Sequence, residues 1–139
     1  IKKNRGRQYT TRRPDTNEIR ICWMLKFAFV NAAAEREYKE LPSEIQDEFG
    51  KDLRRIQFTE ETKNPTEPLQ GFPVNLFEIK INGSPAFRCV YVTKYFDAVI
   101  VLHTFTKTTN GVDKPAMKVT SQRLKELQQE VQADKKAKK

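Results

Sequence analysis

The sequence predicts an α+β domain, in which a small antiparallel β-sheet carries an N-terminal helical hairpin packed on one face and a C-terminal helix. Three patterns indicate this architecture. Residues 19–30 and 76–105 are rich in β-branched and aromatic residues, residues 31–57 place apolar side chains at helical spacing, and residues 113–131 do so again. The chain has 139 residues, 37% of them hydrophobic, which is enough for one compact core.

Positive charge is concentrated at the two ends of the chain. The formal net charge is +8, yet residues 21–131 hold fifteen side chains of each sign. We therefore expect a basic N-terminal arm at 1–18, a single domain at 19–131 and a lysine-rich tail at 132–139. The arm is either a solvated leader or a segment that contacts nucleic acid. Within the domain, residues 68–131 are more basic than residues 31–67, so an anion-binding face is expected in the second half.

The first strand is predicted over residues 19–30, and a short helix follows it. Alternate positions of the strand are apolar and share one face, which must be buried: Ile19, Ile21, Trp23, Leu25, Phe27 and Phe29. Asn31 is a suitable N-cap for the helix, in which Ala34, Tyr38 and Leu41 fall at helical spacing. Pro42 then interrupts this helix.

A second helix is predicted to begin at Ser43, which forms a capping-box pattern with Gln46. Its apolar stripe consists of Ile45, Phe49, Leu53 and Ile56. The two helices therefore form a hairpin that covers one face of the sheet. Residues 59–73, which are rich in Glu, Thr, Asn and Pro, are predicted to be a loop.

Three strands and a helix follow this loop. The segment "LFEIKI" alternates cleanly, "NGSP" turns, and "AFRCVYVTK" returns, which predicts a β-hairpin. The segment "VIVLHTF" is apolar on both faces and is predicted to be a central strand. Asp113 and Pro115 suit the cap and first turn of a last helix, whose buried stripe consists of Met117, Leu124, Leu127 and Val131. The other face of the sheet is expected to be open.

Several classes of site and location are disfavoured by the sequence. Cys22 and Cys89 lie in apolar runs without metal-ligand spacing, so we interpret both as core residues rather than a disulfide or a reactive thiol. No cofactor or metal site is expected. The most apolar segment, "ICWMLKFAFV", is broken by Lys26 and is too short to span a membrane. We expect a cytoplasmic protein.

The candidate site is a cluster of cations on the open face. Strand parity predicts that Lys80 and Arg88 lie directly opposite each other across the hairpin, on the face away from Phe49. Such a pair repels, so it indicates a bound anion or a bridging carboxylate, unless solvent screens both charges. Lys107 follows the central strand and is expected beside Arg88. Three cations around a concave site suit the phosphorane of a phosphodiester reaction, because fixed cations stabilise its extra charge.

Two further residues are candidates for proton transfer. Glu78 shares a face with Lys80 and is either a general base or part of a structural ion pair. His103 lies in the most apolar strand and is either an acid or base or a hydrogen-bonded core residue. Arg88 is expected to be exposed and to contribute little to stability.

The ordered series of motifs resembles the RelE/HigB superfamily of bacterial toxins, most closely the phage-related HigB-type branch. The resemblance runs from Phe27 to Glu130. Its carriers are "ELPSEIQDEFGKDLRRIQ", "LFEIKING" followed by "FRCVY", "VIVLHTFTK", and "KPAMKVTSQRLKE". The resemblance implies a RelE-like fold and a ribosome-dependent mRNA endoribonuclease of a type II toxin–antitoxin system. Such an enzyme cuts mRNA in the ribosomal A site by metal-independent attack of the 2′-hydroxyl, which inhibits translation.

The resemblance also assigns roles to residues by motif position. Arg88 and Lys107 match cations that stabilise the phosphorane, and Lys80 matches the position that holds the phosphate. Glu78 matches the family's Glu, and either Glu78 or His103 moves protons. Arg123 matches a late helical Arg that holds the fold. The implied partners are an antitoxin, expected to be a helix-turn-helix protein, together with the ribosome and mRNA, but no membrane.

Some positions depart from the family pattern. Thr108 replaces a second Lys, Lys114 replaces the Thr before Pro115, the basic arm is longer than usual, and no Tyr lies near the last helix to stack on a base. These departures favour two alternatives: a noncatalytic nucleic-acid-binding module of the same fold, and a protein-binding domain whose tails only solubilise it.

Overall fold

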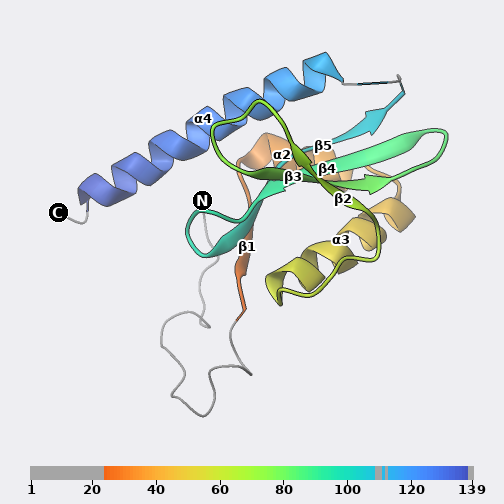
Figure 1. Ribbon diagram of the computed structural model, residues 1–139, viewed down its shortest axis with the longest axis horizontal. Coiled ribbons are helices and arrows are strands. Elements are labelled where there is room, and N and C mark those ends of the chain that lie inside the picture. The colour runs from red at the N-terminus through yellow and green to blue at the C-terminus, as the bar shows by residue number, and fades with distance from the viewer. Residues whose placement is uncertain (1–23, 109–110, 112, 138–139) are drawn as a thin grey trace, which may run out of the picture.

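The computed structural model describes residues 24–108, 111 and 113–137, which form five strands and three helices. Their order is β1 (Lys26–Phe29), α2 (Ala32–Lys39), α3 (Ser43–Gln57), β2 (Thr66–Leu69), β3 (Leu76–Ile81), β4 (Ala86–Val92), β5 (Ala98–Lys107) and α4 (Lys114–Ala137). This order confirms the predicted α+β architecture, with its helical hairpin and its C-terminal helix (Figure 1). The predicted arm at 1–18 lies outside the described residues. Most of the expected lysine-rich tail continues α4.

The five strands form one sheet in the order β1-β5-β4-β3-β2. The sheet that was predicted to be antiparallel is mixed, because β1 pairs in parallel with β5 while the other three pairings are antiparallel. The long connection that a parallel pair needs is supplied by the helices and strands between β1 and β5. The expected loop at 59–73 also contains β2, an exposed edge strand with Pro68 in it.

Each face of the sheet packs against a different helix, as Figure 1 shows with α4 above the strands and α3 below them. The predicted stripe of α3 packs with Ile79, Cys89 and Val101 from one face. On the other face, Leu124 and Leu127 of α4 pack with alternate residues of β4 and β5, including Val90, Val92, Ile100 and Leu102. The prediction that this second face is open is therefore wrong for the part that α4 covers. Lys80 and Arg88 lie on a part of this face that is outside the core contacts of Leu124 and Leu127.

A β-bulge in β5 changes which side chains reach the α4 side of the sheet. Val90 pairs with His103 and Tyr91 pairs with Val101, so Leu102 is an extra residue in the register. His103 and Phe105 consequently lie on the same face as Val90 and Arg88. The carbonyl of Leu102 accepts a hydrogen bond from Arg123 Nη1 at 3.0 Å, which ties the bulge to α4.

The predicted helix caps are partly confirmed. Asn31 Oδ1 accepts from the backbone N–H of Ala34 at 2.9 Å, as expected of an N-cap. Asp113 Oδ1 accepts from the N–H of Ala116 at the start of α4. The capping box of Ser43 and Gln46 is wrong, since Pro42 is the N-cap and makes no side-chain bond. Gln46 instead donates Nε2 to the carbonyls of Lys39 and Leu41, which fixes the turn between α2 and α3.

Candidate nucleic-acid-cleaving site

A pocket of about 440 Å³ opens on the α4 side of the sheet, between β2 and the first turn of α4. Strands β2 to β5 form its floor. Its charged lining is Glu67, Glu78, Lys80, Arg88, Lys107 and Asp113. Its apolar lining is Pro68, Leu69, Phe105 and Met117. The pocket therefore combines three cations, three carboxylates and an apolar wall.

The structure brings together the three cations that the sequence predicts. Lys80 on β3 pairs in register with Arg88 on β4, and Arg88 pairs with Phe105 on β5. The predicted register is confirmed, because Ile79 and Cys89 point to the α3 face with Phe49. Lys107 is the last residue of β5 and lines the same pocket. Strand pairing, rather than a flexible loop, therefore positions all three cations.

Two carboxylates explain how the adjacent cations are tolerated. Lys80 Nζ forms an ion pair with Glu67 on β2, which the sequence did not suggest as a partner. Arg88 Nε lies 3.9 Å from Glu78 Oε1. Glu67 and Glu78 are themselves directly paired across β2 and β3. Each of the two cations therefore has a carboxylate beside it, and these attractions offset the repulsion between Lys80 and Arg88 and between Glu67 and Glu78.

Burial makes Glu78 and Arg88 the most unusual of these four charged residues. Both residues are 8% exposed, so the expectation of an exposed Arg88 is wrong. Burial raises the pKa of the Glu78 carboxyl, and the attraction of Arg88 and Lys80 only partly opposes this. In contrast, the hydrogen bond from Lys80 lowers the pKa of the exposed Glu67. The two neighbouring carboxylates therefore differ in their tendency to take up a proton.

His103 does not line the pocket, although it lies near it. Its Nδ1 is 2.8 Å from Glu37 Oε1 on α2, and its ring stacks on Phe105 with centroids 5.0 Å apart. Burial lowers the pKa of His103, against the opposing effect of Glu37. His103 is therefore a buried, hydrogen-bonded residue, which was one of the two interpretations that the sequence left open.

Glu37 joins this histidine to Arg123 of α4. Arg123 Nη1 and Nη2 donate to the two carboxylate oxygens of Glu37 at 2.7 and 2.8 Å. Burial acts to raise the pKa of Glu37, but the hydrogen bonds from Arg123 and His103 outweigh it and lower that pKa. Arg123 thus links α2, the bulge of β5 and α4, in agreement with the expected fold-holding position.

Sequence reasoning missed Glu67, Phe105 and Met117 as pocket residues. Glu67 was missed because β2 has too few apolar residues to resemble a strand. Phe105 was missed because the bulge at Leu102 inverts the parity of the strand end. Met117 was treated only as part of a core stripe. An antiparallel alignment of "TEPL" with "LFEI" would have suggested the pairing of Glu67 with Glu78.

Other chemistry is not suggested by the described part of the chain. Among those residues, no three His, Cys, Asp or Glu side chains are grouped to hold a metal ion. Cys89 is fully buried as a free thiol, and burial raises its pKa strongly, in agreement with the predicted core role. Cys22 lies outside the described residues. No described helix is long and apolar enough to cross a membrane.

Comparison with known proteins gives a family match. A family described as phage-derived protein Gp49-like matches residues 36–125, a span that runs from α2 into α4 and contains Lys80, Arg88 and Lys107. Among solved structures, a chain of the toxin–antitoxin complex RelBE2 from Mycobacterium tuberculosis is similar, with 17% sequence identity and a TM-score of 0.41. That alignment covers 62% of this chain and 94% of the other. No curated protein matches the sequence.

Proposed function

Because the chain belongs to the family of phage-derived Gp49-like proteins, a family of RelE-like toxins, we propose that it is an endoribonuclease that cuts mRNA on the ribosome. The observation that supports this most is the pocket in which strand pairing places Lys80, Arg88 and Lys107 around one apolar wall. A phosphodiester fits such a pocket, since its charge can face the cations while the adjoining base packs against Phe105 and Met117.

The reaction that suits these groups is an internal transfer at phosphorus. The ribose 2′-oxygen forms a bond to the adjacent phosphorus, and the bond from phosphorus to the 5′-oxygen breaks. The products are a 2′,3′-cyclic phosphate and a 5′-hydroxyl. Lys80 holds the phosphate, while Arg88 and Lys107 stabilise the charge of the phosphorane. Fixed cations contribute most when they are held before the reaction, as strand pairing holds these.

Glu78 is the best-placed group to move the proton. Burial raises the pKa of its carboxyl towards neutral pH. Such a pKa suits a group that accepts a proton from the 2′-hydroxyl and returns it to the 5′-oxygen. His103 is 7% exposed and held by Glu37, so we assign it to positioning Phe105 rather than to proton transfer. The ribosome would supply much of the remaining rate by aligning the 2′-hydroxyl with the phosphorus.

A toxin of this kind works in the cytoplasm and needs a neutralising partner. We propose a cognate antitoxin, a helix-turn-helix protein with acidic residues for the pocket cations and apolar residues for the wall at Phe105 and Met117. Occupation of the pocket by its carboxylates would exclude the phosphodiester.

A second candidate function has one specific observation in its favour. Three carboxylates line the pocket beside the three cations, and Lys80 is already paired with Glu67. A pocket balanced in this way also suits a noncatalytic module that holds RNA or a protein, with Glu78 as a structural partner of Arg88.

The chemistry of the cut ends tests the proposal. Purified protein is added to ribosomes translating a defined mRNA, and cuts are mapped by primer extension. We expect cuts in the A-site codon, with 5′-hydroxyl ends that polynucleotide kinase labels without prior phosphatase treatment. Ends that carry a 5′-phosphate would contradict internal transfer, and the absence of any cut would favour the noncatalytic module.

A further inference from the structure

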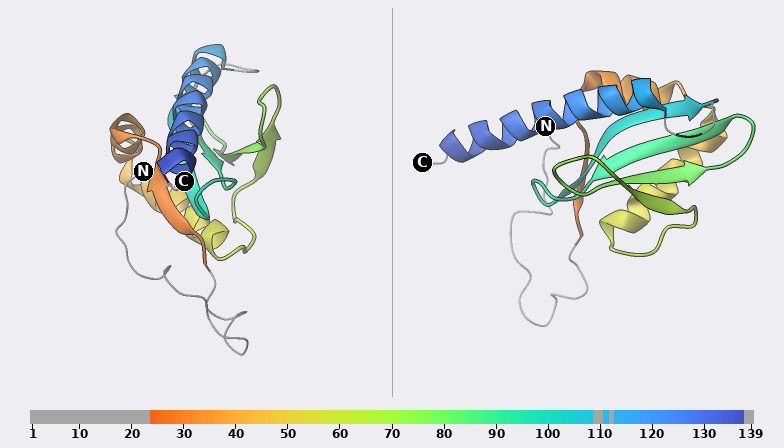
Figure 2. Two further views of the ribbon diagram at one scale, coloured as in Figure 1. Left: turned by 90° about the vertical axis from the view of Figure 1, so that its left-hand side faces the viewer. Right: turned by 45° about the horizontal axis from the view of Figure 1, so that its top comes forward.

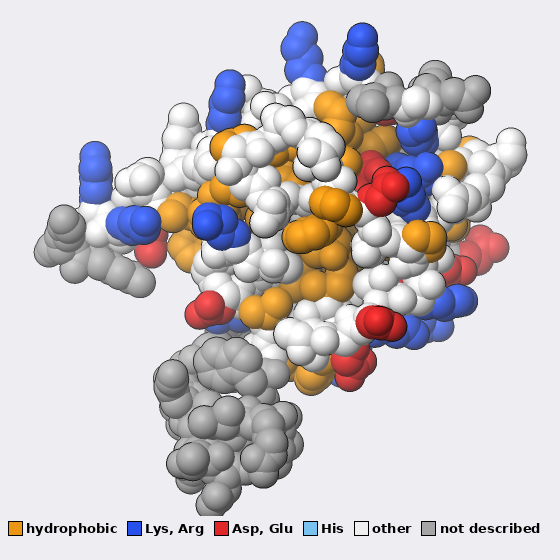
Figure 3. Space-filling view, in the orientation of Figure 1, with side chains coloured by type: hydrophobic (Ala, Val, Ile, Leu, Met, Phe, Trp, Pro, Cys, Tyr) orange, Lys and Arg blue, Asp and Glu red, His pale blue; other side chains and the backbone are white. Residues whose placement is uncertain are grey.

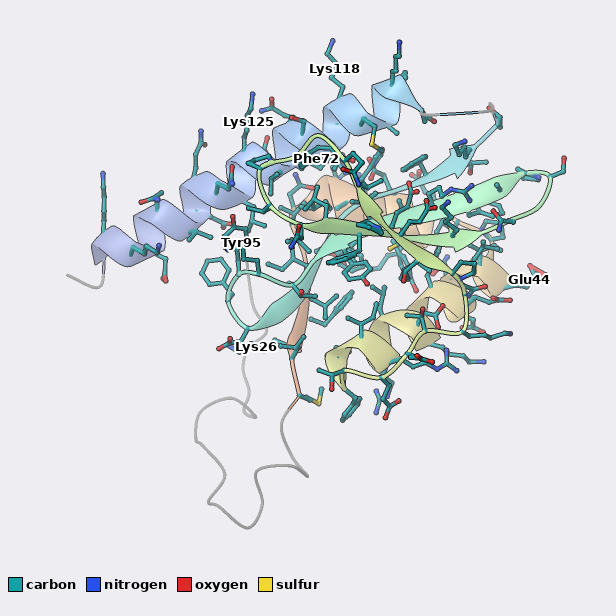
Figure 4. All side chains as sticks on the ribbon, in the orientation of Figure 1. Lys26, Glu44, Phe72, Tyr95, Lys118 and Lys125 are labelled. Carbon is teal, nitrogen blue, oxygen red and sulfur yellow. The ribbon has the colours of Figure 1, made fainter. Side chains whose placement is uncertain are left out.

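Four lysines form a row along the outer face of α4. Lys114, Lys118, Lys125 and Lys136 are all exposed. At about 100° and 1.5 Å per residue, they lie within about 40° of one another around the helix and span about 33 Å along it. Figure 4 shows Lys118 and Lys125 pointing the same way, away from the sheet, and Figure 3 shows Lys and Arg side chains standing out along this helix. We call these four residues the lysine row.

The other faces of α4 are occupied differently. Leu124 and Leu127 face the sheet in the core. Glu126, Glu130 and Asp134 lie about 90° or more around the helix from the middle of the row, and Glu126 Oε1 accepts from Asn31 on α2. Among the described residues, none forms an ion pair with a lysine of the row. The charge of the row is therefore not neutralised within the described fold.

Uncharged side chains lie between the last two lysines of the row. A groove between Lys125 and Lys136 is lined by Gln128, Gln129, Gln132 and Ala133. Amide side chains donate and accept hydrogen bonds, so they suit phosphate oxygens and ribose hydroxyls. A membrane-surface helix would instead carry large apolar side chains beside its lysines. A protein-binding face would centre on aromatic or other large apolar anchors, and Lys is depleted from such centres.

The position of the row relates it to the pocket. Lys114 and Lys118 belong to the first turns of α4, beside Asp113 and Met117 of the pocket lining. From there the helix runs away from the site and extends past the edge of the sheet (Figures 1 and 2). A ligand along the row would therefore start near the cleavage pocket but be held outside it.

We propose that the lysine row binds the phosphate backbone of double-stranded RNA. A straight line of cations about 33 Å long matches a regularly spaced polyanion rather than one compact anion. The inference rests on the proposed function in one respect: the duplex is taken to be a segment of ribosomal RNA. This segment would hold the toxin while mRNA occupies the pocket. Shape and phosphate contacts, rather than base sequence, dominate recognition of an RNA duplex.

The test compares two variants with equal changes in charge. The row variant replaces all four lysines of the row with Gln, which retains helix propensity. The matched control replaces four exposed lysines elsewhere with Gln: Lys39, Lys51, Lys63 and Lys94. Each full-length protein is titrated by fluorescence anisotropy with a labelled RNA duplex of about 16 base pairs, at several salt concentrations. Circular dichroism confirms that both variants keep their helices.

We expect the row variant to lose about tenfold or more in affinity at physiological salt, with the slope of log affinity against log salt reduced by about three to four. The control should change far less. Equal losses in the two variants would overturn the inference, because net charge alone would then explain binding. A row variant that keeps duplex affinity but loses the antitoxin would assign the row to a protein partner.

The same proteins separate this inference from the proposed function. Duplex binding is measured without cleavage, so a wild-type protein that binds the duplex but cuts no mRNA would refute only the nuclease. If the protein does cut, the row variant should need a higher ribosome concentration for half-maximal cleavage than the control. If the row variant keeps the ribosome dependence and the duplex affinity of the wild type, the proposal that the lysine row binds RNA would be refuted, but the nuclease proposal would not.

Discussion

At the scale of single residues, the pocket depends on how each carboxylate is placed relative to the cations. Glu78 is buried beside Arg88, whereas Glu67 is exposed beside Lys80. Burial disfavours the charged form of Glu78, and a close cation favours the charged form of Glu67. Two carboxylates that face each other across β2 and β3 therefore have pKa values shifted in opposite directions.

Glu78→Gln tests the raised pKa. A carboxyl whose folded pKa exceeds its unfolded value stabilises the fold below the unfolded pKa, and that contribution is lost as pH rises through the folded pKa. Relative to Glu78→Gln, the wild-type protein should therefore gain in free energy of unfolding as pH falls from about 8 to about 4. Urea unfolding across this range measures the difference. A relative gain with rising pH would instead indicate that the ion pair with Arg88 dominates.

Glu67→Gln tests whether Glu67 competes with a ligand for Lys80. The substitution releases Lys80, so we expect tighter binding of a short single-stranded RNA. Melting temperature should change little, because Glu67 is exposed and such pairs contribute little. Glu61→Gln, at another exposed glutamate, makes the same charge change and is the control. Equal affinity of the two variants would mean that Lys80 takes no part in anion binding.

At the scale of elements, the register of the β3–β4 hairpin could be predicted and β2 could not, although β4 ends at Val92, two residues before the predicted end of that strand. In the hairpin, strict alternation and a turn at Gly83 fix the register, and a slip of one residue would bury Lys80 and Arg88 against α3. The segment "TEPL" carries no such pattern, since three of its residues are exposed. The bulge at Leu102 was equally hidden, because its stabilising partner, Arg123, is distant in sequence.

The element that carries Glu67 is held in place by Asp52 of α3. This fully buried carboxylate accepts from the backbone N–H of Lys63 and of Asn64, from Asn64 Nδ2, and from Arg55 Nη1. Burial acts to raise the pKa of Asp52, but these four hydrogen bonds outweigh it and lower that pKa. The segment that leads into β2 is therefore fixed to α3 by Asp52, and Asn64 Nδ2 makes one further hydrogen bond to Glu48 Oε1 at 3.2 Å.

Asp52→Ala should lower the free energy of unfolding at neutral pH by about 3 kcal/mol, because it leaves several donors without an acceptor. A lowered folded pKa means that this contribution is present above the unfolded carboxyl pKa and is lost as pH falls through the folded one. The cost should therefore shrink in acid, as measured by urea unfolding at pH 7 and pH 3. Asp47→Ala, on the exposed side of the same helix, should cost little at either pH. Equal costs for the two variants would contradict this role.

At the scale of the whole molecule, the family resemblance read from the sequence is confirmed by the Gp49-like match. Lys80 and Arg88 could be predicted because they lie on regular strands whose parity is readable, and Lys107 could be predicted from its place after the central strand. The carboxylate that pairs with Lys80 and the apolar wall could not, since they depend on β2, on the bulge and on the placement of α4 over the sheet. The local alternation of residues determines which face of a strand each side chain occupies, whereas contacts between elements distant in sequence complete the pocket.

The proposed cleavage and the proposed RNA docking therefore use different parts of the fold. The basic half of the domain contributes the pocket cations and three lysines of the row, and Lys136 of the tail is the fourth. The pocket cations lie on the sheet, whereas the row lies on α4. Loss of a pocket cation should affect the chemical step, and loss of row lysines should affect docking. This division makes the role of Arg88 separable from general attraction to RNA.

The most direct measurement is the single-turnover rate of mRNA cleavage by Arg88→Gln on saturating ribosomes. Loss of a transition-state cation should lower that rate about a hundredfold or more. The fold should survive at 25 °C with a lower melting temperature, because Glu78 loses its partner. Lys94→Gln, at an exposed lysine outside the pocket, should cleave like the wild type. A rate for Arg88→Gln within about twofold of wild type, well below the expected loss, would contradict the catalytic assignment.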